Sequence, residues 1–278
     1  MLTLVEGCSD KSPRTQVLKL VDELKERGVS ADTVEASNPV DIDHVVTSGK
    51  RIVVAADTDS QLRAVVLRAM RQLAPPPSKR PDDLPRDRTV PDLPPIGVLA
   101  LGETPGLVDR LGLPSKPAEV ADAVAAGEVL RTDFARHDGG GITLDGVRIG
   151  GGDRPWRGVI NLDDVLLADG TEQIIACVVA NSDGYAETSG MALAEPSSTD
   201  GKLDVGVAVP IQVKPRWGLG RTKTRIEVRR AKGRAVQVAP LTDTKLVEDG
   251  VAEELKRKRS WWIERGAVGW YVTKDSAE

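Results

Sequence analysis

The apolar segments change their order near residue 130, and this change constrains the fold more than any other feature of the sequence. Before that point, short runs rich in β-branched residues alternate with longer segments whose apolar side chains recur at helical spacing. Strand–helix alternation of this kind predicts a parallel sheet with helices on its faces. The expected strands are 2–5, 29–34, 51–55 and 96–101, the expected helices are 12–27, 60–73 and 117–126, and 42–46 is a short helix or a turn.

After residue 130 the helical periodicity disappears and glycine becomes frequent, with Gly-Gly-Gly triplets at 139–141 and 150–152. Strand-like runs then follow one another directly, at 142–149, 173–180, 203–213, 225–228, 235–238 and 267–272. We therefore predict an α/β protein with an N-terminal parallel-sheet domain over 1–129. An antiparallel β-sandwich-like domain is expected over 130–254, and the C-terminal segment 255–278 is expected to return to the first domain.

Composition excludes several classes of protein. The chain has 278 residues, of which 40% are hydrophobic and 29% charged, as in ordinary globular domains. The longest strictly apolar run, Ile174 to Ala180, has seven residues, whereas a membrane-spanning helix needs about 20. Cys8 and Cys177 form no CxxC pair, so we expect no disulfide framework. The first residues lack the pattern of a secretory signal, and we predict a cytoplasmic protein.

Residues 75–95 interrupt the strand–helix alternation. Eight of these 21 residues are proline, and the others include several charged side chains. This composition predicts a solvated loop with polyproline character. It is either an inert insertion or a ligand for a proline-binding partner.

Basic residues are concentrated at the C-terminal end. The formal net charge is −4, yet residues 211–278 hold 16 lysines and arginines against 9 aspartates and glutamates. Four consecutive cations are followed after one serine by two indoles: Lys256, Arg257, Lys258 and Arg259, then Trp261 and Trp262. Cations favour anionic lipid headgroups and tryptophan favours the membrane interface, so one hypothesis is peripheral binding at the inner membrane face. The other is a solvated loop beside two packed tryptophans.

Polar residues that follow the expected strands mark the candidate ligand site. In open parallel sheets, ligands bind at the carboxyl ends of the strands. Two loops lie there: Ala55-Ala56-Asp57-Thr58-Asp59, and Leu101-Gly102-Glu103-Thr104-Pro105-Gly106. Further along come Asp200-Gly201-Lys202-Leu203-Asp204 and Glu248-Asp249-Gly250.

This series of motifs resembles the catalytic domain of the diacylglycerol kinase family, which includes bacterial lipid kinases and sphingosine kinases and is related to NAD kinase. The family order is Gly-Gly-Asp-Gly-Thr, Pro-Leu-Gly-Thr-Gly-Asn-Asp, Asp-Gly-x-Leu-Asp and Asp-Gly-Glu. The matching segments are 52–66, 98–114, 178–205 with Asn181, Gly190 and Pro196, and Gly266-Ala267 near the end. The resemblance covers the whole chain and implies ATP and Mg²⁺ as cofactors.

The resemblance also assigns roles to residues at the nucleotide loop. The nucleotide-binding positions would be Ala55, Ala56, Asp57, Thr58, Gly102 and Thr104, and Asp57 would be catalytic. The family's glycines let backbone N–H groups approach phosphates closely. Here three of these glycines are absent, Asp59 places a carboxylate where a phosphate would lie, and Pro105 lacks a donor. We therefore expect binding of ATP and Mg²⁺ to be weak or lost.

Two later motifs carry the remaining assignments. Asp249 would belong to the catalytic Asp-Gly-Glu motif, but Val251 stands at the position of the family's general base. Glu248 or Glu253 is an alternative base. At the Asp-Gly-x-Leu-Asp motif, a divalent cation would be held by Asp200 with the carbonyls of Ser197 and Lys202. The alternative there is a simple Asp-Gly turn between two strands.

These observations leave three hypotheses for function. The first is a lipid-kinase-like protein that is catalytically impaired, a pseudokinase that binds or scaffolds at a lipid or membrane surface. The second is an active ATP-dependent kinase that phosphorylates a lipid hydroxyl. The third is an enzyme that acts on a different small molecule. No nucleic-acid partner is expected, and a homodimer or another protein partner remains open.

Overall fold

The structure is a computed structural model. It describes residues 2–6, 11–36, 38–101, 106–152, 154–213 and 223–273. The chain divides into two compact units, here called unit 1 (Met1–Phe134 with Glu264–Glu278) and unit 2 (Ala135–Ile263). The domain limits given above from the sequence, 129/130 and 254/255, remain predictions.

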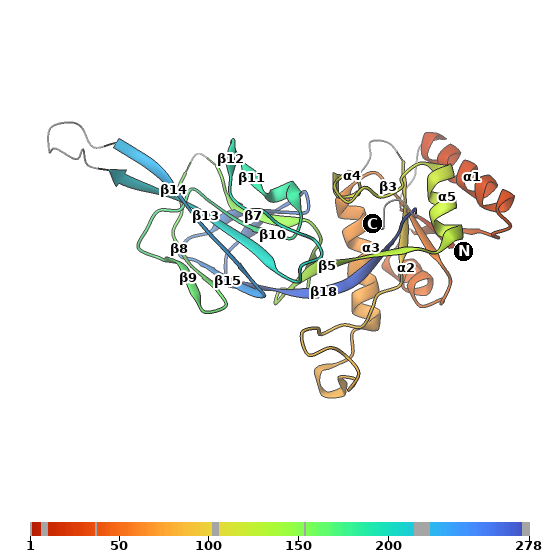
Figure 1. Ribbon diagram of the computed structural model, residues 1–278, viewed down its shortest axis with the longest axis horizontal. Coiled ribbons are helices and arrows are strands. Elements are labelled where there is room, and N and C mark those ends of the chain that lie inside the picture. Colours follow the sequence, from red (N-terminus) through yellow and green to blue (C-terminus); the bar gives the residue numbers. More distant parts are fainter. Residues whose placement is uncertain are drawn as a thin grey trace. The chain divides into compact units, whose positions relative to one another are not determined.

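Unit 1 begins with alternating strands and helices (Figure 1). Its elements are β1 (Leu2–Glu6), α1 (Lys11–Glu26), β2 (Asp32–Ala36), α2 (Pro39–Val46), β3 (Ile52–Ala56), α3 (Asp59–Leu73), the 3₁₀ turn η1 (Pro77–Lys79), β4 (Ile96–Ala100), α4 (Gly106–Arg110), α5 (Pro117–Ala126) and most of β5 (Val129–His137). The C-terminal half of β18 (Arg259–Tyr271) also belongs to this unit. The strand–helix alternation predicted from the sequence is confirmed.

The sheet of unit 1 is parallel, with the order β2-β1-β3-β4-β18. Helices α1 and α5 pack on one face of it, against Val53, Ala55 and Leu99. Strand β3 is buried along its whole length, as expected of a central strand that is covered on both faces. This packing fixes the carboxyl end of β3, from which the candidate nucleotide loop starts.

Most of the proline-rich segment 75–95 is exposed or partly exposed, as predicted for a solvated loop, but some of its residues are packed. Leu84, Val90 and Leu93 are buried. The Arg80 guanidinium donates to main-chain carbonyls of the same segment, at 3.2 Å from the oxygen of Leu84 and 2.6 Å from that of Arg88. Apolar anchors and an arginine that takes the place of missing backbone donors therefore give part of this segment a packed structure.

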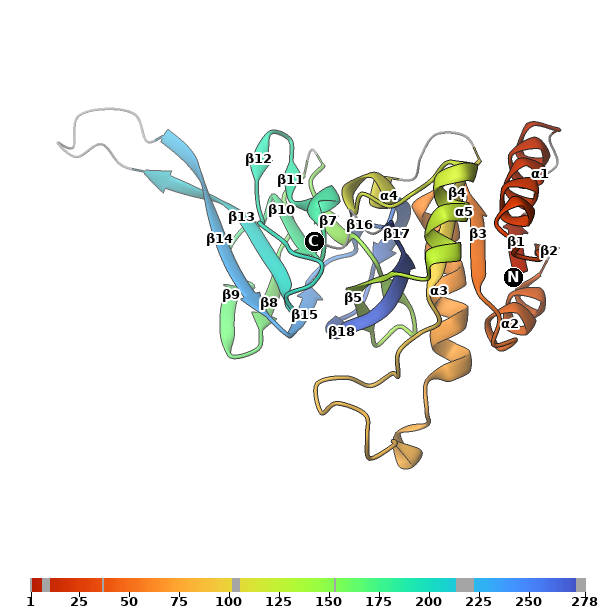
Figure 2. The same cartoon turned by 45° about the vertical axis from the view of Figure 1, so that its right-hand side comes forward.

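Unit 2 is made almost wholly of strands (Figure 2). They are β6 (Ile142–Thr143), β7 (Gly146–Gly150), β8 (Gly158–Leu162), β9 (Val165–Asp169), β10 (Ala176–Ala180), β11 (Glu187–Thr188), β12 (Met191–Ala192), β13 (Leu203–Val213), β14 (Lys223–Gly233), β15 (Ala235–Pro240), β16 (Thr244–Glu248) and β17 (Val251–Leu255), with the 3₁₀ turn η2 (Asp183–Tyr185) and the first half of β18.

Two antiparallel layers form unit 2, as predicted for a sandwich. One has the order β14-β13-β10-β7-β16-β17, and the other joins β18, β15, β8 and β9. A single core lies between them, in which Val179 of β10 and Val207 of β13 pack with Val238 of β15 and Trp261 of β18. The α/β plus β-sandwich fold class is therefore confirmed.

A loop covers the outer face of the first layer of unit 2. Leu193 and Ala194 are buried there against Ala176, Val178 and Ala208. The approach is so close that a Cβ at Gly206 would lie 2.1 Å from the carbonyl oxygen of Leu193. The segment after β12 is thus held tightly on β13, which positions the Asp200 turn that follows. Within the described ranges, no helix is long and apolar enough to cross a membrane.

Candidate functional site

The loop after β3 satisfies its polar groups internally. Ala55 and Ala56 are the last two residues of the strand and are buried, and Asp57 is exposed. The backbone N–H of Asp57 donates to the Gln61 side chain at 2.9 Å, and the Thr58 side chain caps α3 by accepting from the N–H of Gln61. A phosphate in this loop would have to compete with these bonds.

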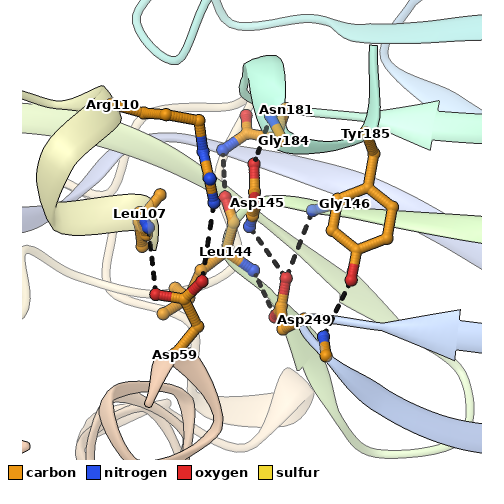
Figure 3. Close-up of polar contacts among 11 residues, drawn as sticks. Asp59, Leu107, Arg110, Leu144, Asp145, Gly146, Asn181, Gly184, Tyr185 and Asp249 are labelled. Carbon is orange, nitrogen blue, oxygen red and sulfur yellow. Dashed lines mark hydrogen bonds and ion pairs between the residues drawn. The ribbon is translucent and has the colours of Figure 1, made fainter. Parts of the chain in front are cut away.

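Asp59, the first residue of α3, takes up further donors nearby (Figure 3). Its carboxylate accepts a hydrogen bond of 3.0 Å from the backbone N–H of Leu107 and lies 3.5 Å from a guanidinium nitrogen of Arg110. Backbone N–H groups and a guanidinium are also the groups that bind phosphate in proteins. Here an internal carboxylate occupies them.

Two of the predicted nucleotide-binding residues, Gly102 and Thr104, lie outside the described residues. The roles predicted for Ala55, Ala56, Asp57 and Thr58 remain predictions. Arg110 was not identified from the sequence, although it lies in segment 98–114, because only the folded structure brings it to Asp59.

Asp249 stands at the hairpin between β16 and β17. Asp249 and Gly250 have φ of 46° and 81°, the left-handed pair that a tight two-residue hairpin needs. The Asp249 side chain is 1% exposed and accepts from the backbone N–H groups of Leu144, Asp145 and Gly146, at 2.8, 2.9 and 3.2 Å (Figure 3). The expected strand 142–149 is consequently split, since its backbone at 144–146 turns toward this carboxylate.

A second contact fixes the same hairpin. The hydroxyl of Tyr185 accepts from the N–H of Gly250 at 2.8 Å, and burial raises the pKa of Tyr185 to about 12. The catalytic role of Asp249 remains a prediction. Its geometry gives the carboxylate a structural function, because three backbone donors would lose their acceptor without it.

The alternative general bases are also engaged. Glu248 is fully buried and accepts from the Nε1 of Trp261 at 3.1 Å and from the hydroxyl of Thr143. Glu253 is exposed on β17 and pairs with Arg259 at 3.3 Å. Neither carboxylate has the accessible, unpaired state that a base acting on a bound hydroxyl requires.

The Asp200–Gly201 turn precedes β13. Gly201 has a φ of 71°, and the carboxylate of Asp200 accepts from the N–H of Lys202 at 2.9 Å, as in an ordinary Asx turn. The Nζ of Lys232 lies 2.7 Å from the carbonyl oxygen of Glu195, 3.2 Å from Asp204 and 3.8 Å from Asp200. The hydroxyl of Ser197 contacts that of Thr199, and the cation-binding role expected of the Ser197 and Lys202 carbonyls remains a prediction.

These contacts do not fit the divalent cation expected at this turn. Among the side chains that the structure describes, no group of three or more His, Cys, Asp or Glu residues could hold a metal. The two carboxylates that face each other here, Asp200 and Asp204, already share an ammonium group. The sequence did not reveal Lys232 because it is brought opposite Asp204 only by the β13–β14 register.

The basic run lies between β17 and β18 and ends at Arg259, the first residue of β18. Lys256, Arg257 and Lys258 are exposed, and together with Arg259, Asp138 and Gly139 they line a cavity of about 540 Å³ in unit 2. Trp261 is fully buried in the core of this unit, and Trp262 is partly buried. The hypothesis that Trp261 inserts into a membrane is therefore wrong, because its indole packs inward and donates to Glu248.

Comparison with known proteins supports the fold. No family model matches the chain, and no curated protein matches it. A solved structure of a diacylglycerol kinase from Bacillus anthracis is similar over 99% of this chain and 97% of its own, with 16% identity and a TM-score of 0.66. An NAD kinase from Archaeoglobus fulgidus in complex with ATP is similar over 100% and 96%, with 14% identity and a TM-score of 0.57. The chain thus has the diacylglycerol kinase/NAD kinase-like fold, as the motif order predicted.

Proposed function

We propose that this chain is a catalytically impaired lipid-kinase-like protein, which acts by binding and not by phosphoryl transfer. The observation that carries the proposal is the carboxylate of Asp59. It accepts from the N–H of Leu107 and pairs with Arg110 at the end of the sheet where the fold class binds its ligands. An ATP phosphate would have to displace a covalently attached anion and would meet its negative charge.

The shortage of a general base supports the same proposal. Val251 stands where the resemblance expects a glutamate, and it cannot take a proton. Glu248 is buried in contacts with Thr143 and Trp261. The other carboxylates of the β16–β17 hairpin are engaged as well, Asp249 with three backbone N–H groups and Glu253 with Arg259.

Calorimetric titration with ATP and Mg²⁺ tests the proposal. The unmodified chain is expected to show no binding tighter than millimolar. Asp59→Thr removes the carboxylate that contacts the N–H of Leu107 and the guanidinium of Arg110, so it should gain at least about tenfold in ATP affinity. Asp22→Thr, at an exposed position of α1, is the matched control and should gain nothing.

Two results would contradict this. Micromolar binding by the unmodified chain, about 8 kcal/mol of binding free energy, would show that the nucleotide loop is functional. If a folded Asp59→Thr variant gains no affinity for ATP, the loop after β3 does not correspond to the family's nucleotide loop.

The alternative function is an active ATP-dependent lipid kinase. The fold favours it, because its neighbours include a diacylglycerol kinase and an NAD kinase in complex with ATP. A transfer assay with labelled ATP, Mg²⁺ and diacylglycerol in mixed micelles decides between the two. We expect no labelled lipid. Labelled lipid that disappears in Asp57→Asn would establish the alternative.

We further propose that the bound surface is anionic lipid, contacted by the exposed run Lys256 to Lys258. Lys256 pairs with Glu254 at 3.1 Å, and no described residue forms an ion pair with Arg257 or Lys258. Each cation near an anionic leaflet contributes about 1 kcal/mol. Co-sedimentation with anionic vesicles should fall when all three become Gln, whereas Trp261 should contribute nothing. Equal binding to neutral vesicles would refute the proposal.

A further inference from the structure

We infer that the ammonium group of Lys232 is a built-in cation, which takes the place of a divalent metal ion at the Asp200 turn. Unit 2 then needs no metal to hold this turn on β13. The inference concerns unit 2 alone and does not depend on the proposed function, which rests on the nucleotide loop of unit 1.

Three oxygens converge on the nitrogen of Lys232. They belong to the carbonyl of Glu195 at 2.7 Å, the carboxylate of Asp204 at 3.2 Å and the carboxylate of Asp200 at 3.8 Å. A main-chain carbonyl with two carboxylates is a donor set that also suits hard divalent cations. Here the ammonium group of Lys232 occupies this donor set: it donates a hydrogen bond to the carbonyl of Glu195 and lies within ion-pair distance of both carboxylates.

The surrounding structure holds these oxygens in place. Lys232 lies directly opposite Asp204 in the register of β14 and β13. The other oxygen of Asp204 accepts from the N–H of Glu195 at 3.4 Å, so that both backbone polar groups of Glu195 are engaged. Two residues earlier, Leu193 packs its backbone on Gly206. The site is therefore built by three separate segments of unit 2.

Burial makes a cation necessary at this position. The Asp204 side chain is only 6% exposed, whereas that of Lys232 is 43% exposed and reaches in from the strand edge. Burial raises the pKa of Asp204, and the ammonium of Lys232 acts against that rise. A carboxylate in such surroundings needs a positive partner, and a covalently attached one is present at any metal concentration.

Manganese binding tests this inference, because Mn²⁺ prefers oxygen ligands and its free form is read directly by electron paramagnetic resonance. The unmodified chain should leave Mn²⁺ free at this site. Lys232→Ala removes the ammonium and leaves its space, so this variant should bind Mn²⁺ at least about tenfold more tightly. The thermal midpoint of Lys232→Ala should rise with Mn²⁺, and that of the unmodified chain should not.

Two controls separate this site from others on the surface. Lys223→Ala removes an exposed lysine from the same strand and should gain no binding. The double variant Lys232→Ala with Asp200→Asn should lose the Mn²⁺ binding that Lys232→Ala gained. Lys232→Gln keeps the length of the side chain without its charge and serves as the second variant.

Each outcome decides the inference. Mn²⁺ binding by the unmodified chain that Asp200→Asn abolishes would overturn it, because the turn would then still hold a metal. Folded Lys232→Ala and Lys232→Gln proteins that both fail to bind Mn²⁺ would also overturn it. If the variants fold only when Mn²⁺ is added, the inference is supported, and if Mn²⁺ does not restore folding, it is refuted.

Discussion

The loop after β3 in unit 1 and the turn before β13 in unit 2 resemble each other in one respect. In the first, the carboxylate of Asp59 accepts a hydrogen bond from a backbone N–H and pairs with a guanidinium. In the second, the ammonium of Lys232 donates to a backbone carbonyl and pairs with two carboxylates. Both places correspond to positions where the resemblance expects an external ion, a phosphate and a divalent metal. In each place stands a side chain whose charge has the same sign as the expected ion: the anionic Asp59 for the phosphate and the cationic Lys232 for the metal.

The two regions differ in burial. The side chains of Asp59 and Arg110 are 20% and 26% exposed, so water screens part of their interaction. Asp204 is almost fully buried and depends more on its partner. We therefore expect the internal cation of unit 2 to matter more for stability than the internal anion of unit 1.

The largest expected effect is that of Lys232→Ala without metal. Loss of the ammonium leaves the buried Asp204 carboxylate uncompensated, which should lower the free energy of unfolding of unit 2 by about 2 kcal/mol. Hydrogen exchange measured by mass spectrometry on peptides from β13 and β14 localises the change. The comparison fails if Lys223→Ala on the same strand has an equal effect.

Asp59→Ala should have a smaller effect, a loss of about 1 kcal/mol in unit 1. One backbone hydrogen bond and one partly exposed ion pair are removed. Asp59→Asn keeps an acceptor for the N–H of Leu107 and should recover part of the loss. Exchange in α3 and α4 peptides reports the change, and a loss greater than that of Lys232→Ala would reverse the ranking of the two regions.

Two carboxylates, Asp204 in unit 2 and Asp122 in unit 1, should contribute to stability with opposite dependence on pH. Burial raises the pKa of Asp204 above 3.8, so the folded state binds more protons and unit 2 loses stability as pH rises from 3.8 through the raised pKa. In unit 1, a hydrogen bond from Arg27 lowers the pKa of Asp122, so stability is lost as pH falls below 3.8. Asp204→Asn should abolish the first trend alone, as measured by exchange at several pH values.

The smallest effect concerns coupling between the two regions. Because Asp59 and Lys232 belong to different units and share no partner among the described contacts, the double variant should be additive within about 0.5 kcal/mol. A double-mutant cycle on the free energy of unfolding checks this. A larger coupling energy would mean that the two internal ions are not independent.

Much of the fold followed from local patterns in the sequence. Helix α3 begins at Asp59 because Thr58 caps it, and β3 follows from a short β-branched run after Gly49. The antiparallel strands of unit 2 followed from consecutive apolar runs between turn residues. The order of four weak motifs then identified the fold, which the structural neighbours confirm.

The site could be predicted only in part, because its decisive contacts are made between distant segments. The carboxylate of Asp59 was recognised as unfavourable for a phosphate, but its partner Arg110 lies 51 residues away. Lys232 could not be linked to Asp204 without the β13–β14 register. The sequence left open whether Trp261 lies at a surface or packs inward, and the structure shows its side chain in the core of unit 2.

The most direct test of the central claim is the thermal unfolding of the unmodified chain with and without ATP and Mg²⁺. If the Asp59 carboxylate and the Lys232 ammonium take the place of external ions, ligand should not change the unfolding midpoint. The midpoint measured in buffer with a chelator should equal that measured in about 1 mM ATP with excess Mg²⁺. A chain that bound ATP with micromolar affinity would be stabilised by about 4 kcal/mol at that concentration, with a clear rise in the midpoint. Such a rise would contradict the claim that Asp59 and Lys232 have replaced the phosphate and the metal.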